Sequence, residues 1–255
     1  MKIKYSIPHS YSFAYYRNTI NILNFQLVLS TQLNDEQCRN WENSLRKKIN
    51  GNIDLKKKNL IKESLLESPL FMQEEFKISS LSSYVISYTA NTENYLKELI
   101  ELCLKRNTGL RKKAFSKIEF SALKLEEDIS VNQIKKELFQ TISMEKSQGK
   151  LFTEKYKRLC SFLNIDKSFL SKEILESLDS IWELRNKIAH SKSGKMDSYD
   201  LKLSGKKIRI QKTARENEYF EFVTDLLLFV NNLISTFEEL DHKATENWLA
   251  DEFVN

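Results

Sequence analysis

The sequence is poor in the two residues that most often turn or interrupt a chain. Five Gly and two Pro, Pro8 and Pro69, occur among its 255 residues. A β-sandwich or a doubly wound α/β fold needs many more glycines for tight turns and phosphate-binding loops. Neither G-x-x-x-x-G-K nor G-x-G-x-x-G occurs in the chain. Because 41% of the residues are apolar, a sizeable core is available, and we predict an all-α protein built from long helices.

Apolar residues recur at helical spacing along most of the chain after residue 78. A long helix is predicted from residue 79 to 105, because Leu81, Val85, Tyr88, Leu96, Leu99 and Cys103 share one of its faces. Shorter helices are predicted over 118–128, 133–144, 151–163 and 171–189, and a long closing helix over 216–240. Before that closing helix, residues 199–203 and 207–211 flank Ser204-Gly205 and predict a small β-hairpin.

The first 78 residues are less regular. Apolar residues partly alternate between residues 20 and 29, so a strand competes with a helix there. Helices are predicted over 34–48 and 56–66, and Ser68-Pro69 marks a break. The basic stretch 105–117 is compatible with a loop or a helix start. We therefore divide the chain into an N-terminal elaboration, residues 1–78, and a helical domain, residues 79–255.

Charge and composition exclude some classes of protein. The formal charge is +5, which is compatible with a nucleic-acid partner but is also typical of a solvated helical surface. The three cysteines and three histidines are scattered, so we expect no metal, no cofactor and no disulfide framework. We expect a cytoplasmic protein, because no apolar stretch is long enough for a signal peptide or a membrane span.

One helix carries an arginine where packing would favour leucine. When Leu178 is set at zero on a helical wheel, Arg185 falls about 20° from the centre of the apolar stripe, and Asn186 lies at its edge, near 80°. Burying an unpaired guanidinium is costly, so Arg185 must face a partner, a cleft or a ligand. A phosphate suits its planar fork. The alternative is an ordinary ion pair with a carboxylate across a helix interface.

His190 lies five residues after Arg185. On a straight helix the two would be separated by about 140° and about 7.5 Å along the axis. Ser191 to Gly194 resemble a helix end, so His190 is expected at or beyond the last turn, where it can fold back towards the stripe. A simpler role is also open, because a histidine near a helix C-terminus interacts favourably with the helix dipole.

The segment Arg185-Asn186-Lys187-Ile188-Ala189-His190, at the end of an amphipathic helix, resembles the R-x4–6-H motif of the HEPN superfamily. The order of helices is also similar. The resemblance implies a HEPN-like helical bundle, in which the N-terminal region and the hairpin are additions. A family variant with a Tyr two residues after the His is not supported, because Lys192 stands there.

The resemblance implies a metal-independent endoribonuclease acting as a homodimer, with Arg185 and His190 as catalytic residues and Asn186 as an orienting group. Glu93 is a candidate to brace the arginine, although an ordinary surface role is equally open. Basic residues that could contact RNA phosphates are Lys105, Arg106, Arg111, Lys112, Lys113, Lys192 and Lys195. Aromatic side chains that could stack on bases, or form a buried cluster, are Tyr11, Phe13, Tyr15 and Tyr16.

Three functions remain open from the sequence. The resemblance favours a ribonuclease that serves as a toxin or in antiviral defence, with RNA as substrate and an antitoxin or defence-system protein as a possible partner. The second is a non-catalytic HEPN-like module that binds RNA or protein and uses the motif helix for dimerisation. The third is a subunit that accompanies a nucleotidyltransferase.

Overall fold

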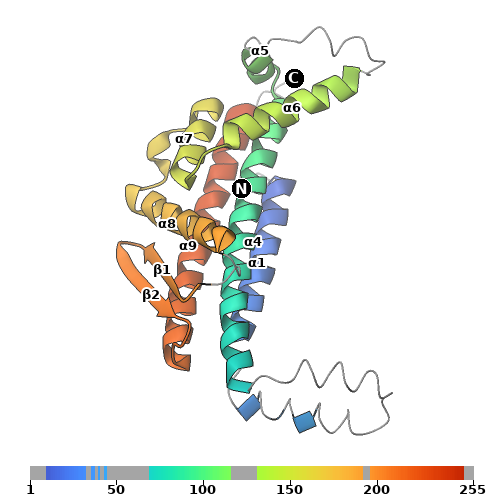
Figure 1. Ribbon diagram of the computed structural model, residues 1–255. Helices are drawn as coiled ribbons and strands as arrows, with labels where there is room; N and C mark the ends of the chain where they lie inside the picture. Colours follow the sequence, from blue (N-terminus) through green and yellow to red (C-terminus); the bar gives the residue numbers. More distant parts are fainter. Residues whose placement is uncertain are drawn as a thin grey trace, which may run out of the picture.

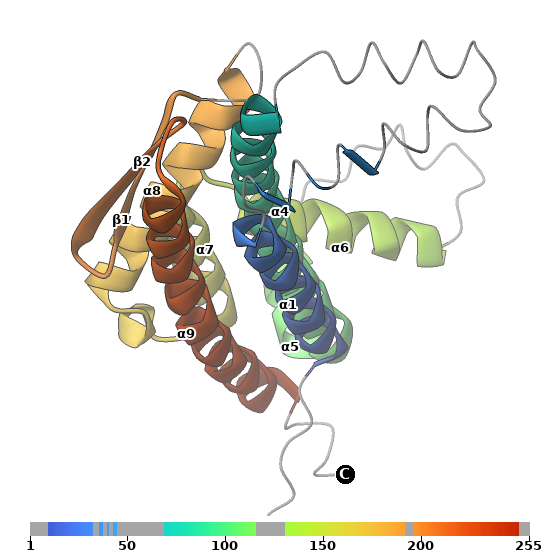
Figure 2. The same cartoon turned by 90° about the horizontal axis from the view of Figure 1, so that it is seen from below.

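Three long helices lie side by side and form the frame of the molecule in the computed structural model (Figure 1). They are α1 (Tyr11–Thr31), α4 (Pro69–Arg106) and α9 (Glu216–Leu249). The structure describes residues 10–32, 69–115, 131–191 and 196–249, with isolated positions between 36 and 44. A view from below shows α1, α4 and α9 as neighbours, with α7 and α8 beside them (Figure 2). The described part of the chain is therefore all-α, as predicted, apart from one small hairpin.

The remaining elements cover one side and one end of this frame. They are α5 (Thr108–Phe115), α6 (Val131–Ser147), α7 (Phe152–Leu163), the short 3-10 helix η2 (Lys167–Phe169) and α8 (Lys172–His190). Helix α8 crosses the long helices and contacts α4 and α7. The predicted hairpin is present, as strands β1 (Ser198–Leu203) and β2 (Lys206–Gln211).

The hairpin turn requires an unusual backbone conformation. The strands pair antiparallel, from Ser198 opposite Gln211 to Leu203 opposite Lys206. Ser204 and Gly205 connect them with φ of 47° and 78°. Two consecutive positive φ angles give the twist that a two-residue hairpin needs, and glycine adopts this conformation without steric cost. The Ser204-Gly205 pair fits this turn, which is why the sequence predicts a hairpin here.

The first helix resolves the conflict between strand and helix over residues 20–29. Helix α1 buries Phe13, Ile20 and Leu27 against α4 and α9, whereas Phe25 and Leu29 on its outer face are exposed. Apolar residues on both faces hide the helical period in the sequence. Because α1 shares the core, and because the predicted boundary after residue 78 lies inside α4, α1 is an integral part of the helical unit.

Other predicted boundaries differ from the structure in informative ways. Helix α4 begins at Pro69, ten residues before the predicted start at residue 79. Proline fits the first position of a helix, where its missing N–H is not needed. The basic stretch after Arg106 forms helix α5, and the Asn107 side chain accepts a hydrogen bond from the Leu110 N–H (2.7 Å) at its start. The helices predicted over 56–66 and 118–128, and most of the helix predicted over 34–48, lie outside the described residues.

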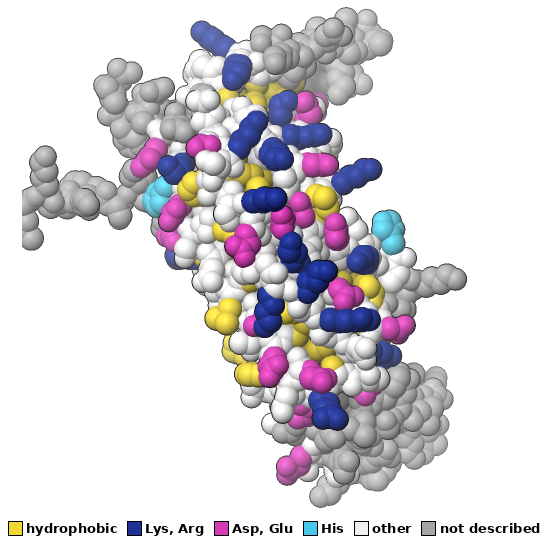
Figure 3. Space-filling model, turned by 90° about the vertical axis from the view of Figure 1, so that its left-hand side faces the viewer, with side chains coloured by type: hydrophobic (Ala, Val, Ile, Leu, Met, Phe, Trp, Pro, Cys, Tyr) yellow, Lys and Arg dark blue, Asp and Glu magenta, His cyan; other side chains and the backbone are white. Residues whose placement is uncertain are grey.

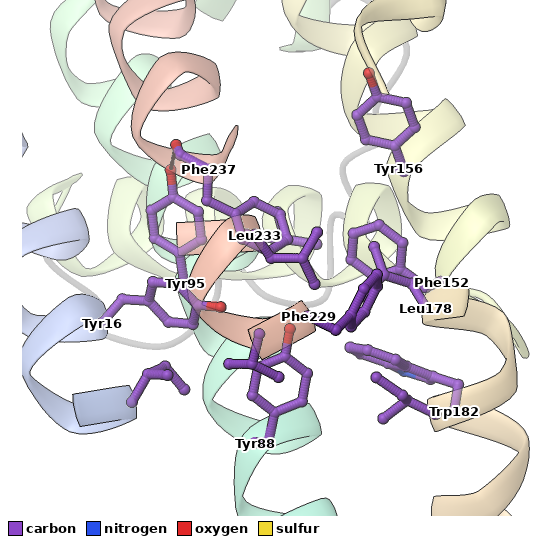
Figure 4. Close-up of a cluster of buried hydrophobic side chains, with 14 of the residues drawn as sticks. Tyr16, Tyr88, Tyr95, Phe152, Tyr156, Leu178, Trp182, Phe229, Leu233 and Phe237 are labelled. Atoms are coloured by element: carbon purple, nitrogen blue, oxygen red, sulfur yellow. Dashed lines mark hydrogen bonds between the residues drawn. The ribbon is translucent and has the colours of Figure 1, made fainter. Parts of the chain in front are cut away.

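The core is rich in aromatic rings from every long helix. Figure 4 shows Tyr16 of α1, Tyr95 of α4, Phe237 of α9, Phe152 of α7 and Trp182 of α8 pointing towards one another. The ring centroids of Tyr16 and Tyr95 are 4.9 Å apart, and those of Phe152 and Trp182 are 5.1 Å apart. Such contacts stabilise the core beyond the burial of apolar area. They also fix α7 and α8 against the frame.

Helix α9 is long and apolar enough to satisfy a simple membrane-span test over Glu216–Glu246. It is the one helix among the described residues that does so. Its inward side chains, including Val230, Leu233 and Phe237, are buried against the rest of the chain. The core helix of a soluble protein can pass the same test, and 39% of the tested window of α9 is buried inside the structure.

A buried carboxylate joins the two ends of the described chain. Asp241 of α9 is fully buried and accepts hydrogen bonds from the Ser10 N–H (2.9 Å), the Ser10 hydroxyl (2.6 Å) and the Tyr95 hydroxyl (3.3 Å). The Ser10 Oγ in turn accepts from the N–H of Phe13 (3.0 Å) and caps α1. Asp241 therefore holds the start of α1 against the end of α9.

We predict that Asp241→Ala lowers the free energy of unfolding by about 2–4 kcal/mol, because three buried donors lose a charged acceptor. Urea unfolding followed by circular dichroism measures the change. The control is Glu239→Ala, an exposed acidic residue on the same helix, for which a change within about 0.5 kcal/mol is expected. Equal stability of the two variants would contradict this role for Asp241.

Candidate functional site at the end of α8

Helix α8 is defined by side-chain caps at both ends. At its start, the Ser171 hydroxyl accepts from the Ile174 N–H (3.2 Å). At its end, Ser191 leaves the helical conformation, and both its N–H (3.2 Å) and its hydroxyl (2.8 Å) donate to the Ile188 carbonyl. His190 is therefore the last helical residue, within the last turn as expected from the sequence.

Trp182 anchors α8 in the core. Its side chain is 1% exposed and packs between Phe152 of α7 and Tyr88 of α4 (Figure 4). Its indole Nε1 donates to Glu93 Oε1 of α4 (2.9 Å). The same oxygen lies 3.2 Å from the Nζ of Lys155, a lysine that is buried on α7. One carboxylate thus ties α4, α7 and α8 together one turn before Arg185.

The hairpin covers the side of α8 that carries Ser177 and Ser180. Two small serines allow its backbone to approach: the Lys202 N–H donates to Ser180 Oγ (2.9 Å), and the Ser204 N–H donates to Ser177 Oγ (3.0 Å). The Lys202 ammonium also bonds to Glu176 (2.5 Å). The middle of α8 is therefore held between the core and the hairpin, whereas its C-terminal residues Ala189 and His190 are exposed.

Arg185 lies at the point where α8 leaves the core. It is half-buried, as expected for a residue on the apolar stripe near a helix end. Its Nη1 donates to Oδ1 of Asn186 (3.0 Å). Within the described residues the guanidinium makes no ion pair with a carboxylate, so the alternative of an ordinary internal pair is not what the structure contains. Because Asn186 uses its oxygen here, its amide hydrogens and the other guanidinium N–H groups stay available as donors.

His190 is exposed at the tip of the same helix. It does not contact Arg185, from which it is separated by about 140° around the helix. However, it follows Asn186 by four residues, a spacing that places two side chains on one face with Cβ atoms about 5–6 Å apart. Asn186 therefore stands between the arginine, to which it is hydrogen-bonded, and the histidine. Arg185 and His190 therefore face different sides of the end of α8, with Asn186 placed between them.

The other candidate residues have different positions. Glu93 contacts Trp182 and Lys155 rather than Arg185, so it supports the motif helix and not the guanidinium. Arg111 donates to the Lys105 carbonyl (2.6 Å) and the Leu104 carbonyl (3.3 Å), and so provides hydrogen-bond donors for backbone carbonyls in the last turn of α4. Lys105 forms an exposed pair with Glu101 (3.7 Å).

The remaining basic and aromatic candidates are not part of this site either. Arg106, Lys112 and Lys113 are exposed at the junction of α4 and α5, whereas Lys192 and Lys195 lie outside the described residues. Phe13 and Tyr16 are buried in the aromatic core, whereas Tyr11 and Tyr15 are exposed on α1.

Thiol and metal chemistry find no support in the described ranges. Burial raises the pKa of the Cys103 thiol to about 12 and that of the Cys160 thiol to about 11. Both are therefore protonated at neutral pH and are poor nucleophiles. In this part of the chain, no three His, Cys, Asp or Glu side chains are grouped closely enough to hold a metal ion. Cys38 lies outside it.

Sequence analysis missed the residues that support α8. Lys155 lies on the buried face of α7, next to Phe152, Tyr156 and Leu159. The wheel argument that singled out Arg185 applies equally to this lysine, because a cation on an apolar face requires a partner. Glu93, at the margin of the apolar face of α4, supplies that partner. The same test on α7 would have shown that Lys155 needs a partner, although not which residue supplies it.

We predict that Glu93→Ala destabilises the protein by about 2–3 kcal/mol, because it leaves the buried Lys155 ammonium without a counter-charge and the Trp182 indole N–H without an acceptor. Glu93→Gln should cost less, since the amide oxygen still accepts from Trp182. Denaturant unfolding of both variants tests this order, with the exposed Glu98→Ala of the same helix as the control. If Glu93→Ala and Glu98→Ala have the same free energy of unfolding, the contacts of Glu93 with Trp182 and Lys155 do not stabilise the protein.

Comparisons of the chain with protein-family models, with curated proteins and with solved structures found no match in any of the three. We therefore infer the function from the chemistry of the residues at the end of α8.

Proposed function

We propose that the protein is an endoribonuclease that cleaves RNA without a metal ion. The observation that carries this proposal is the state of Arg185, a half-buried guanidinium held by the Asn186 amide instead of by a carboxylate. A carboxylate partner would neutralise its charge, whereas an amide orients it and leaves the charge to a ligand. The exposed imidazole of His190, on the same helix end, is the proposed proton-transfer group.

The proposed reaction is an internal transesterification. His190 accepts the proton of an RNA 2′-hydroxyl, and the 2′-oxygen attacks the adjacent phosphorus atom. The bond from phosphorus to the 5′-oxygen breaks, and that oxygen takes up a proton. Arg185 and Asn186 donate hydrogen bonds to the non-bridging oxygens as negative charge increases on them. The products are a 2′,3′-cyclic phosphate and a 5′-hydroxyl.

A second copy of the chain completes this chemistry. One proton must be removed from the nucleophile and another delivered to the leaving oxygen, and α8 supplies one imidazole. A two-fold dimer brings the same surface of both copies together, so two ends of α8 in one cleft would provide two imidazoles and two guanidinium groups. We therefore propose a homodimer with a shared site. The resemblance to HEPN ribonucleases further suggests a toxin or antiviral-defence role, with an antitoxin or defence-system protein as a possible partner.

We predict that His190→Ala and Arg185→Ala each reduce RNA cleavage by at least about a hundredfold, the scale of a lost proton-transfer group or charge-stabilising donor. Asn186→Ala should have a smaller effect, because the guanidinium loses its orientation but stays in place. Cleavage of a labelled RNA is measured on a denaturing gel, and end-group analysis tests for the cyclic phosphate.

The controls for this assay use residues outside the site. Arg215→Ala and His242→Ala remove the same side-chain types from the loop after β2 and from α9, and they should cleave at the wild-type rate. Activity should persist in EDTA. Loss of activity on chelation would contradict the metal-independent mechanism. RNA binding without cleavage by the wild type would favour the alternative, a non-catalytic RNA-binding or dimerisation module.

We also predict that His190→Ala chains inhibit the wild type in a mixture. With about a ninefold excess of the variant, nearly every wild-type chain is paired with a variant chain, so activity per wild-type chain should fall to about one-tenth if both imidazoles are needed. Subunit exchange is verified with two affinity tags, and RNA is kept in large excess so that binding by the variant does not deplete it. Unchanged activity per wild-type chain would show that each copy works alone.

A further inference from the structure

A concave, positively charged surface lies at the end of the molecule formed by α5, α6 and α7. It is a half-open pocket of about 630 Å³. Its lining contains five basic side chains and one acidic side chain, Glu145. The basic residues are Lys113, Lys146, Lys157, Arg158 and Lys167. This formal excess of four positive charges is close to the +5 of the whole chain.

Most of this charge is not neutralised locally. Lys146 is paired with Glu145 (2.6 Å). Lys157, Arg158 and Lys167 are exposed and form no ion pair with any carboxylate among the described residues. Figure 3 shows the side of the molecule that carries α7, with Lys and Arg side chains in its upper part and also further down, where they are interspersed with Asp and Glu. A concave surface lined by one sign of charge focuses the electric field and concentrates ions of the opposite sign.

The floor of the pocket is apolar. Ile142 of α6 and Phe162 of α7 are buried there, and Ala114 of α5 and the hydroxyl of Ser161 complete the lining. Cations at a rim and apolar groups at a floor match a nucleotide, whose phosphate is anionic and whose base and ribose have weakly hydrated faces. The cations come from four separate elements and have long, flexible side chains, and no glycine loop is present in the lining. This arrangement favours a polynucleotide backbone over a single tightly held phosphate group.

We propose that the pocket between α5, α6 and α7 binds the phosphate backbone of single-stranded RNA, as a contact site separate from Arg185 and His190. This inference rests on the proposed function in so far as RNA is the substrate. Helix α7 connects the two places: Lys157 and Arg158 lie on its pocket side, whereas Phe152 at its start packs on Trp182 of the motif helix. An RNA strand held at the pocket would therefore contact the helix that packs against the motif helix.

The test measures binding of a fluorescently labelled single-stranded RNA of about 20 nucleotides by anisotropy. The full-length chain carries His190→Ala as a common background, so that cleavage does not interfere. Adding Lys157→Gln and Arg158→Gln should weaken binding by about tenfold at moderate salt. It should also reduce the slope of log K against log salt by about 1.4, since each lost phosphate contact contributes about 0.7 for a single strand.

The matched control removes one lysine and one arginine elsewhere, with Lys207→Gln and Arg215→Gln on and after β2. It should bind within about twofold of the parent at each salt concentration. Equal weakening by both double variants would overturn the proposal, because only net charge would then matter. Parent-like binding by the pocket variant would overturn it as well. Lys167→Gln, from a different element, provides a second pocket variant and should weaken binding on its own.

A separate arm distinguishes the source of the phosphate. ATP is added as a probe to the parent protein and to the pocket variant. Pocket-dependent ATP binding, together with RNA binding that is insensitive to Lys157 and Arg158, would overturn the proposal in favour of a free-nucleotide site. The cleavage assay on wild type remains independent. If the pocket residues are needed for RNA binding but the wild type does not cleave RNA, the pocket proposal is supported and the ribonuclease proposal is contradicted. If the wild type cleaves RNA but the pocket residues are not needed for binding, the ribonuclease proposal is supported and the pocket proposal is contradicted.

Discussion

The hydrogen bond from the Trp182 indole to Glu93 fixes the position of everything at the end of α8. Trp182 is the side chain through which α8 enters the aromatic core, and Glu93 connects it to α4 and, through Lys155, to α7. A buried indole N–H needs an acceptor, and a buried ammonium needs a counter-charge. A single carboxylate satisfies both requirements. Arg185 follows Trp182 by three residues, less than one helical turn. Fixing Trp182 in the core therefore also fixes the backbone of Arg185 at the margin of the core.

This support has a consequence for the charge at the site. In the described part of the chain, Glu93 is committed to Lys155 and Trp182, so it does not neutralise Arg185. The partner that Arg185 has, Asn186, carries no charge. A guanidinium that is partly removed from water and not compensated by an anion stabilises any phosphate that approaches it more strongly than a fully solvated one would. The two cations therefore differ: the buried ammonium of Lys155 is neutralised by Glu93, whereas the half-buried guanidinium of Arg185 has an uncharged partner.

The sequence predicted the helices and the hairpin well because local signals specify them: few glycines, clear apolar periodicity and a Ser204-Gly205 turn. It also placed Arg185 correctly at the buried edge of α8. It could not predict that residues 20–29 are helical, because α1 has apolar side chains on both faces. Nor could it predict the hairpin packing on Ser177 and Ser180, since small polar residues on a helix are equally suited to solvent. The partner of Glu93 and the charged pocket depend on which elements meet in space, and no local pattern encodes that.

The phase of α8 decides what kind of site its end can form. If His190 followed Arg185 by four residues, both would lie on one face, and one chain could present a complete pair. With a spacing of five residues, the arginine turns towards the core margin while the histidine faces solvent, and the Asn186 side chain is placed between these two directions. A group turned away from its own arginine can still meet the arginine of a second copy across a two-fold axis. The spacing that weakens the argument for a site within one chain is therefore an argument for a site shared between two.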